Sequence, residues 1–352
     1  MNEIVRKPTR PLLLGGFQIG GDAPVSIQSM LNVKTADVEA ATAQIRRLIA
    51  AGCEIIRFSV MDMDDARAIR DLSRHSSVPL IADIHFDHKL AIAAITHGID
   101  GLRINPGNIG SRQGVESLVA VAKERLIPIR IGVNGGSLPK DLLAKYGHGK
   151  DAMVEAALRH VQILEALGYH EIKISVKASQ IDLMLASYRE LSKRVNYPLH
   201  LGLTESGTLF SGSIKSAMAL GILLEEGIGD TIRVSLSADP IQEVLVAKQI
   251  LVALGLRKGL NIVSCPTCGR TRINLIALAE RVEAALVDDQ DKELTIAVMG
   301  CAVNGPGEAR EADFGIAGGA GEGLIFARGQ IVAKVPEEDL VDELIRLIRE
   351  ST

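Results

Sequence analysis

Residues 25–60 read VSIQSMLNVKTADVEAATAQIRRLIAAGCEIIRFSV and contain one full unit of the pattern that organises most of the chain. Apolar strands are predicted at 25–30 and at 53–60. Between them, residues 36–50 carry Val38, Ala41, Ile45 and Leu48 at the spacing of an amphipathic helix. This stretch therefore predicts a strand, a polar loop, a helix and the next strand.

The same unit recurs eight times. Strands are predicted at 25–30, 53–60, 79–85, 101–107, 127–134, 171–177, 199–205 and 231–237, and a helix-length segment follows each. Alternating strands and helices imply parallel pairing, and eight units over about 235 residues favour a (β/α)8 TIM-type barrel, which is an α/β fold. A doubly wound sheet is the alternative, but QSMLNVKT after the first strand lacks a glycine-rich dinucleotide loop.

A second unit follows the barrel pattern, which ends at LRKGLNIVSCPTCGR, residues 256–270. Beyond it we predict a helix at 271–287, a strand at 293–300, a hairpin of GLIFA and QIVAKV turning at Arg328 and Gly329, and a helix at 337–350. We therefore expect two domains, a barrel over 1–259 that binds the substrate and a smaller α+β domain over 260–352.

Composition narrows the function classes. The 352-residue chain has a net charge of −4, only six Phe and four Tyr, and no Trp, which argues against nucleic-acid binding. The apolar run Pro11 to Leu14 is too short for a secretion signal, and VLVAKQILVALGL is interrupted by Lys248 and Gln249. We expect a soluble cytoplasmic protein, in which the four cysteines are metal ligands, catalytic thiols or core residues rather than disulfide partners.

Polar residues gather at the predicted carboxyl ends of the strands, where the active site of a TIM-type barrel lies. An arginine interrupts four otherwise apolar strands, at Arg57, Arg103, Arg130 and Arg233. Guanidinium groups converging on one mouth match phosphate oxygens, so we predict a substrate with at least one phosphate. The other candidate binding residues are Asp83, His85, Asn134 and Lys177, and the acids expected near the arginines are Asp83 and Glu205.

The cysteines suggest a metal centre in the second domain. Cys265 and Cys268 form a Cys-x-x-Cys pair, and Cys301 lies in MGCAVNGPGEA; Cys53 opens a barrel strand and is expected in the core. A zinc site would normally recruit a histidine, and none occurs after His200. A redox dithiol would leave Cys301 unexplained. An iron–sulfur cluster with three thiolates and one other ligand fits better, and Glu308 is the nearest candidate.

Taken together, these motifs resemble the 4-hydroxy-3-methylbut-2-enyl diphosphate synthase family. The resemblance rests on SCPTCGR and MGCAVNGPGEA and extends through VSIQSM, IADIHFD, LRINPGNIG, IRIGVNGGSL and GLTESG, over nearly the whole chain. The length resembles that of the short bacterial form. The resemblance implies a barrel joined to a domain that holds a [4Fe–4S] cluster through Cys265, Cys268, Cys301 and Glu308.

The resemblance also implies an activity. Members of the family reductively open and dehydrate 2-C-methyl-D-erythritol 2,4-cyclodiphosphate to 4-hydroxy-3-methylbut-2-enyl diphosphate in the methylerythritol phosphate route to isoprenoids. Ferredoxin or flavodoxin would supply the electrons, and Glu308 would give a proton to the departing hydroxyl. A head-to-tail homodimer is implied, in which the cluster domain of one chain closes over the barrel mouth of the other.

Two other functions remain open at the level of sequence. One is a zinc-stabilised, phosphate-binding barrel lyase or isomerase, which would be colourless. The other is a non-catalytic cluster protein that carries electrons, although such a protein would not need a barrel mouth rich in cations.

Overall fold

The computed structural model describes residues 4–105, 107–286, 289, 292–301, 307, 309–319 and 321–351. It divides into two compact units, Met1–Leu256 and Arg257–Thr352. Within the described ranges, no helix combines the length and the apolar character needed to cross a membrane.

The first unit is the predicted parallel barrel. Its strands run in the spatial order β8, β7, β6, β5, β4, β3, β10, β9, and a bridge between Ile174 and Leu199 joins the two ends of this sheet. The strands are β3 (Ser26–Met30), β4 (Ile55–Ser59), β5 (Leu80–Asp83), β6 (Gly101–Ile104), β7 (Ile129–Asn134), β8 (Ile172–Lys177), β9 (His200–Leu201) and β10 (Thr231–Ile232). The (β/α)8 prediction is confirmed.

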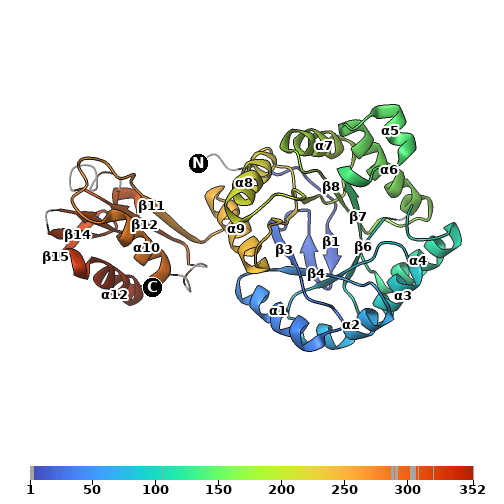
Figure 1. The fold of residues 1–352 in the computed structure, drawn as a ribbon, viewed down its shortest axis with the longest axis horizontal. Helices are drawn as coiled ribbons and strands as arrows, with labels where there is room; N and C mark the ends of the chain where they lie inside the picture. The colour runs from blue at the N-terminus through green and yellow to red at the C-terminus, as the bar shows by residue number, and fades with distance from the viewer. Residues whose placement is uncertain are drawn as a thin grey trace. The chain divides into compact units, whose positions relative to one another are not determined.

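Helices surround these strands (Figure 1). They are α1 (Val38–Ala50), α2 (Met63–His75), α3 (His88–Thr96), α4 (Arg112–Arg125), α5 (Lys140–Tyr146), α6 (Lys150–Ala166), α7 (Ile181–Arg194), α8 (Leu209–Glu225) and α9 (Pro240–Ala253). Several begin at an N-cap carboxylate that accepts a backbone N–H, as Asp37, Asp62 and Asp239 do. Each cap marks the residue at which the loop from the preceding strand ends and the helix begins.

A short hairpin at the amino-terminal side was not predicted. It consists of β1 (Leu12–Leu14) and β2 (Phe17–Ile19), which pair antiparallel. Leu12, Leu14 and Ile19 are buried against Ile55 and Ile81, the first inward positions of two barrel strands. The hairpin therefore closes the bottom of the barrel and leaves the carboxyl ends of the strands as its accessible mouth.

The last two barrel strands are much shorter than predicted, since β9 and β10 pair over two residues each. After these two residues, the backbone of each segment no longer pairs with the neighbouring strands. Leu203, Thr204 and Ser235, which the sequence pattern assigned to strands, line a cavity at the mouth instead. The apolar alternation continues there because these segments still cover the core.

The second unit is a five-stranded sheet in the order β11, β12, β13, β14, β15. Its elements are β11 (Leu260–Ser264), α10 (Leu275–Ala285), β12 (Leu294–Met299), β13 (Phe314–Gly318), β14 (Glu322–Ala327), β15 (Gln330–Pro336) and α12 (Leu340–Ser351), with single 3₁₀ turns at Ala309–Glu311 and Glu337–Asp339. The predicted hairpin is confirmed as β14 and β15, whereas β11 and β13 were not predicted.

Helices α10 and α12 bury one face of this sheet. Val282 and Leu344 pack with Ile296 and Ile316 in a single apolar cluster. The opposite face carries a smaller cluster in which Met299 and Phe326 pack with Ala312, and Cys265 lies against it. The first two cysteines of the unit therefore follow β11 on a sheet with its own core.

Candidate active site

One cavity of about 220 Å³ lies at the carboxyl ends of the barrel strands. All eight predicted binding residues line it. They are Arg57, Asp83, His85, Arg103, Arg130, Asn134, Lys177 and Arg233, joined by Ser175, Leu203, Thr204 and Ser235. Parallel strands bring these side chains together because their carboxyl ends meet at one rim. The volume suits one small molecule rather than a dinucleotide.

Asp83 is shared by three basic groups. Its Oδ1 lies 3.1 Å from Arg103 Nη1 and 3.5 Å from His85 Nε2, and its Oδ2 lies 3.6 Å from Arg57 Nε. Burial raises the pKa of this carboxyl, but Arg57 and Arg103 outweigh burial and lower it overall. Asp83 is therefore an anion at neutral pH that fixes two guanidinium groups.

His85 stands at the edge of the cavity, with 47% of its side chain exposed. Partial burial lowers its pKa, and nearby Arg103 lowers it further against the opposing effect of Asp83. The imidazole is therefore mainly neutral at pH 7. Both of its ring nitrogens lie 3.2 Å from Arg103 Nη1.

Arg103 is held by backbone as well as by Asp83. It donates from Nη2 to the carbonyl oxygen of Gly132 at 3.0 Å. A Cβ at Gly132 would come within 2.6 Å of Arg103 Nε, so only glycine leaves room for this side chain.

Arg130 has the fewest internal partners of the four arginines. It donates from Nη1 to Ser175 Oγ at 2.8 Å, while its Nε and Nη2 have no hydrogen-bond partner among the described residues. Burial, reinforced by Arg57 and Arg103, holds the pKa of Arg130 well below its ordinary value. Two buried donors are thus available to an anionic ligand.

The acid beside Arg233 is not the expected one. Glu243, on the first turns of α9, accepts from Arg233 at 3.3 Å and is buried, whereas Glu205 is exposed in a neighbouring pocket. Glu205 has a left-handed φ of 57° on the loop after β9. The expectation that Glu205 would be one of the acids near the arginines was wrong, because Glu205 lies on an exposed loop, whereas Glu243 comes from α9, which packs against β3.

Lys177 ends β8 beside Gly202. A Cβ at Gly202 would lie 2.6 Å from Lys177 Nζ, which shows that the amine points across the barrel interior. Burial and the nearby Arg130 hold the pKa of Lys177 well below its ordinary value. Four guanidinium groups face two carboxylates here, so the cavity has an excess of positive charge even before Lys177 is considered.

Sequence reasoning missed Ser175, Leu203, Ser235 and Glu243. Ser175 was detectable, because it stands on the inward alternation between Lys173 and Lys177. Glu243 carries no such signal, since its distance from Arg233 depends on how α9 packs.

In the second unit, Cys265 and Cys301 follow adjacent parallel strands. Ser264 pairs with Val298, so the two cysteines come just beyond the same edge of the sheet. The Gly300 N–H points to Cys265 Sγ at 3.1 Å, and the loop is tied down by Arg272 N–H donating to the Gly300 carbonyl. The chain turns tightly at Cys268, where Thr271 N–H donates to the Cys268 carbonyl.

The donor chemistry of this loop fits an iron–sulfur cluster. A backbone N–H and the side chain of Arg270 lower the pKa of the exposed Cys268 thiol, which favours the thiolate that a cluster iron requires. Glu308 lies outside the described residues. Among those the structure does describe, no three His, Cys, Asp or Glu side chains are close enough together to bind a single metal ion.

Cys53 is a core residue, as expected. Its side chain is 2% exposed, and burial raises its pKa to about 12. It is not part of any candidate site.

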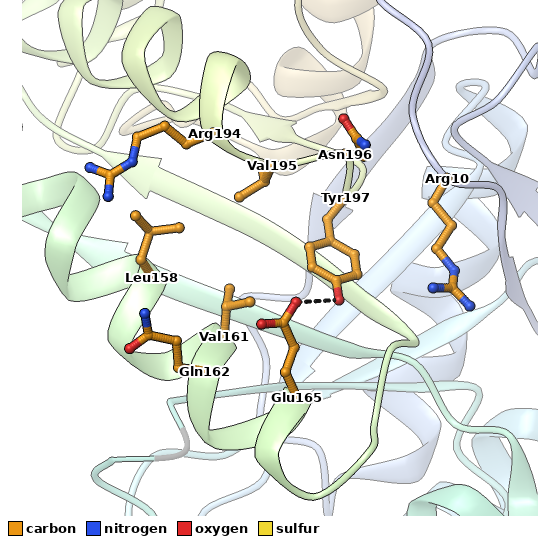
Figure 2. Close-up of a pocket in the computed structure, with 9 residues that line it drawn as sticks. All are labelled: Arg10, Leu158, Val161, Gln162, Glu165, Arg194, Val195, Asn196 and Tyr197. Atoms are coloured by element: carbon orange, nitrogen blue, oxygen red, sulfur yellow. Dashed lines mark hydrogen bonds between the residues drawn. The ribbon is translucent and has the colours of Figure 1, made fainter.

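A second barrel pocket, of about 460 Å³, lies near the amino ends of β8 and β9 (Figure 2). Two of its polar side chains have ordinary partners, one inside the pocket and one just outside it. Tyr197 Oη donates to Glu165 Oε1 at 2.9 Å, and Arg194 pairs with Glu155 at 2.7 Å. Because this pocket has no comparable excess of charge, the mouth cavity is the better candidate for the active site.

A TIM-type barrel with a cationic mouth, followed by a cysteine-bearing α+β unit, defines a two-domain barrel enzyme. The GcpE TIM-barrel domain matches residues 9–248, and the GcpE protein C-terminal domain matches residues 261–350. The chain belongs to the GcpE family, the 4-hydroxy-3-methylbut-2-en-1-yl diphosphate synthases, which confirms the resemblance seen in the sequence. Members of this family use an iron–sulfur cluster.

Two curated relatives illustrate the similarity. The chain is 61% identical over 343 residues to the 4-hydroxy-3-methylbut-2-en-1-yl diphosphate synthase (flavodoxin) of Geobacter sulfurreducens, covering 97% of both chains. It is 57% identical to the enzyme of the same name from Clostridium perfringens, covering 97% of this chain and 99% of that one. Dihydropteroate synthase from Xanthomonas albilineans shares the barrel fold alone, with a TM-score of 0.52, 17% identity, and coverage of 70% of this chain and 97% of that one.

Proposed function

We propose that this chain catalyses the reductive ring opening and dehydration of 2-C-methyl-D-erythritol 2,4-cyclodiphosphate to 4-hydroxy-3-methylbut-2-enyl diphosphate in isoprenoid biosynthesis. The observation that carries this proposal is the mouth cavity, where four arginines and Lys177 meet only two carboxylates. The reaction takes up two electrons and one proton, releases one water, and turns a cyclic dianion into a linear trianion. Fixed cations stabilise the charge that develops on the diphosphate oxygen.

Each arginine has a distinct part in this proposal. Arg130 offers its two unpartnered nitrogens to the diphosphate directly. Arg57 and Arg103 are oriented by Asp83 and add charge without having to be reorganised. Arg233, Lys177, His85 and Asn134 complete the ring of donors around the substrate.

For the cofactor, Cys265, Cys268, Cys301 and Glu308 are proposed to hold a [4Fe–4S] cluster. When bound, the cluster supplies electrons singly and a Lewis-acidic iron. The chain contributes the N–H groups that stabilise the thiolates, of which Gly300 N–H is one. Glu308, as the ligand that is not a thiolate, is proposed to give the proton that leaves with the hydroxyl.

We further propose flavodoxin as the electron donor, because the names of both relatives include it. A homodimer, in which the 260–352 domain of one chain serves the 1–259 barrel of the other, completes the proposal.

Cluster content and turnover test the ligand assignment. The protein is purified without oxygen as wild type, Cys301→Ser, Glu308→Gln and Cys53→Ala. Cys301→Ser should lose most of its iron, sulfide and visible absorption, and Glu308→Gln should lose turnover of the cyclic diphosphate with reduced flavodoxin. Cys53→Ala, which alters a buried barrel thiol, should retain both. Normal iron content and full turnover in the first two variants would overturn the assignment.

A further inference from the structure

Beneath the mouth cavity lies a layer of polar side chains that the proposed reaction does not use. We call this the buried polar layer; its members are Ser26, Gln28, Lys173 and His200. All four are at most 2% exposed. They come from β3, β8 and β9, which with β10 are consecutive around the barrel.

Strand alternation directs these side chains inward. Ser175 and Lys177 line the cavity, so Lys173 faces the same interior one period deeper, roughly 7 Å below Ser175 along the strand. On β3, Met30 Sδ accepts from Arg57, which places Gln28 and Ser26 on the inward face as well. His200 lies two residues before Gly202, the glycine that faces Lys177.

The polar atoms of the layer lack protein partners. Lys173 Nζ, both amide atoms of Gln28, His200 Nε2 and Ser26 Oγ have no hydrogen-bond partner among the described residues. His200 is anchored only through Nδ1, which lies 2.7 Å from Thr231 Oγ1. Buried polar groups in such numbers are normally satisfied by ordered water.

The surroundings of Lys173 disfavour its cationic form. Arg130 pairs with it in register on β7, Arg57 faces it from β4, and Lys177 lies above it on β8. Asp230, at the amino end of β10, acts in the opposite direction, but it already binds Arg6 and Thr9. The neighbouring His200 is itself held neutral by burial.

We propose that the buried polar layer is a hydrated compartment in which Lys173 takes up a proton when the diphosphate binds in the cavity above it. The negative charge of the ligand offsets the repulsion from Arg130 and Arg57, so the ammonium form becomes favourable. The proton passes from buffer to the Lys173 amine, and no other bond changes. Lys173 is thus a positioning residue whose positive charge increases when the cavity is filled.

The direction in which affinity changes with pH depends on the protonation of Lys173 before the ligand binds. Burial, with Arg130 next in effect, lowers the pKa of Lys173 to about 7. At pH 8 the amine is therefore mainly neutral before binding and gains its proton on binding. Affinity should strengthen as pH falls from 9 towards 7, by about tenfold per pH unit for each proton taken up.

Calorimetric titration tests this proposal, which rests on the proposed function for the identity of the ligand. The cyclic diphosphate is titrated without reductant into wild type, Lys173→Met, Lys173→Arg and Lys150→Met at pH 8, in buffers of low and high ionisation enthalpy. Lys173→Met and Lys173→Arg should each take up about one proton fewer than wild type. Lys173→Arg should bind more tightly than Lys173→Met, and Lys150→Met, with an exposed lysine on α6, should match wild type.

Unchanged proton uptake in Lys173→Met would overturn the proposal. If that variant does not fold, the affinity of wild type is measured between pH 7 and 9 instead. An affinity that does not change with pH over this range would overturn the proposal, because proton uptake on binding makes affinity depend on pH. If the cyclic diphosphate does not bind wild type, the proposed function fails. The same titrations with inorganic diphosphate then still test Lys173, through the difference in proton uptake between variant and wild type.

Discussion

Asp83 is the carboxylate on which the arrangement of the barrel mouth depends. It is 5% exposed and lies within 3.6 Å of nitrogens on both Arg57 and Arg103. Asp83→Asn should lower the free energy of unfolding by about 3 kcal/mol, because it leaves buried guanidinium groups without their counter-ion. Urea unfolding at pH 7 measures the loss.

The stability lost in Asp83→Asn should depend on pH. The folded-state pKa of Asp83 lies below its ordinary value, so the stabilisation is present at neutral pH and disappears as pH falls through the folded-state pKa. The difference between wild type and Asp83→Asn should therefore shrink in acid. Asp141→Asn, which breaks an exposed pair with Arg159, is the matched control and should leave stability almost unchanged. Equal losses in the two variants would contradict the assigned role.

Removing the charge of Arg130 should make the unliganded protein more stable but weaken its binding of the diphosphate. Its unpartnered nitrogens make it costly in the unliganded protein. Arg130→Met should therefore raise the free energy of unfolding by about 1 kcal/mol while weakening diphosphate binding at least about 30-fold. Thermal unfolding and calorimetry measure the two effects, with the exposed Arg112→Met as the control. Lower stability with unchanged affinity would show that Arg130 is a structural residue.

At the scale of elements, the β1–β2 hairpin offers a matched pair of neighbouring residues. Leu14 is 2% exposed and packs under the barrel, whereas Leu13 is 59% exposed. Leu14→Ala should lower the free energy of unfolding by about 2 to 5 kcal/mol through the cavity that it creates, and Leu13→Ala should have a far smaller effect. Denaturant unfolding of both variants is the measurement. A similar loss in both would mean that the hairpin does not close the barrel.

Hydrophobic periodicity predicted well those elements whose own residues carry the complete apolar pattern. Helix α1, expected at 36–50, spans Val38–Ala50, and the four apolar residues Val38, Ala41, Ile45 and Leu48 suffice to predict it. Strands β11 and β13 were missed because β11 overlaps the charged linker around Lys258 and β13 reads FGIAG, with glycine at two of five positions. Both are strands because of their neighbours in the sheet: β11 pairs with β12, and β13 pairs with β12 and β14.

At the scale of the whole molecule, the proposed homodimer predicts complementation between inactive chains. Arg130→Met is expected to disable the barrel at low substrate concentration, and Cys301→Ser is expected to disable the cluster domain. If each barrel is served by the partner's cluster domain, co-expressed and co-purified chains form a mixed dimer with one intact site. That mixture should recover a substantial fraction of wild-type turnover, whereas each variant alone remains inactive. Absence of recovery in an isolated mixed dimer would show that barrel and cluster domain of the same chain work together.

The sequence by itself determined the barrel, its eight strand–helix units and eight of the twelve residues that line its mouth. Strand alternation and parallel pairing are local rules, and together they bring Arg57, Arg103 and Arg130 to one rim. The sequence also indicated Asp83 as an acid beside these arginines, but only the tertiary structure decided which acid meets Arg233. Arg233 pairs with Glu243 rather than Glu205, and Lys173 Nζ and His200 Nε2 lie in one interior layer with no hydrogen-bond partner among the described residues. Such contacts depend on distances between segments that lie far apart in the chain, and hydrophobic periodicity carries no information about those distances.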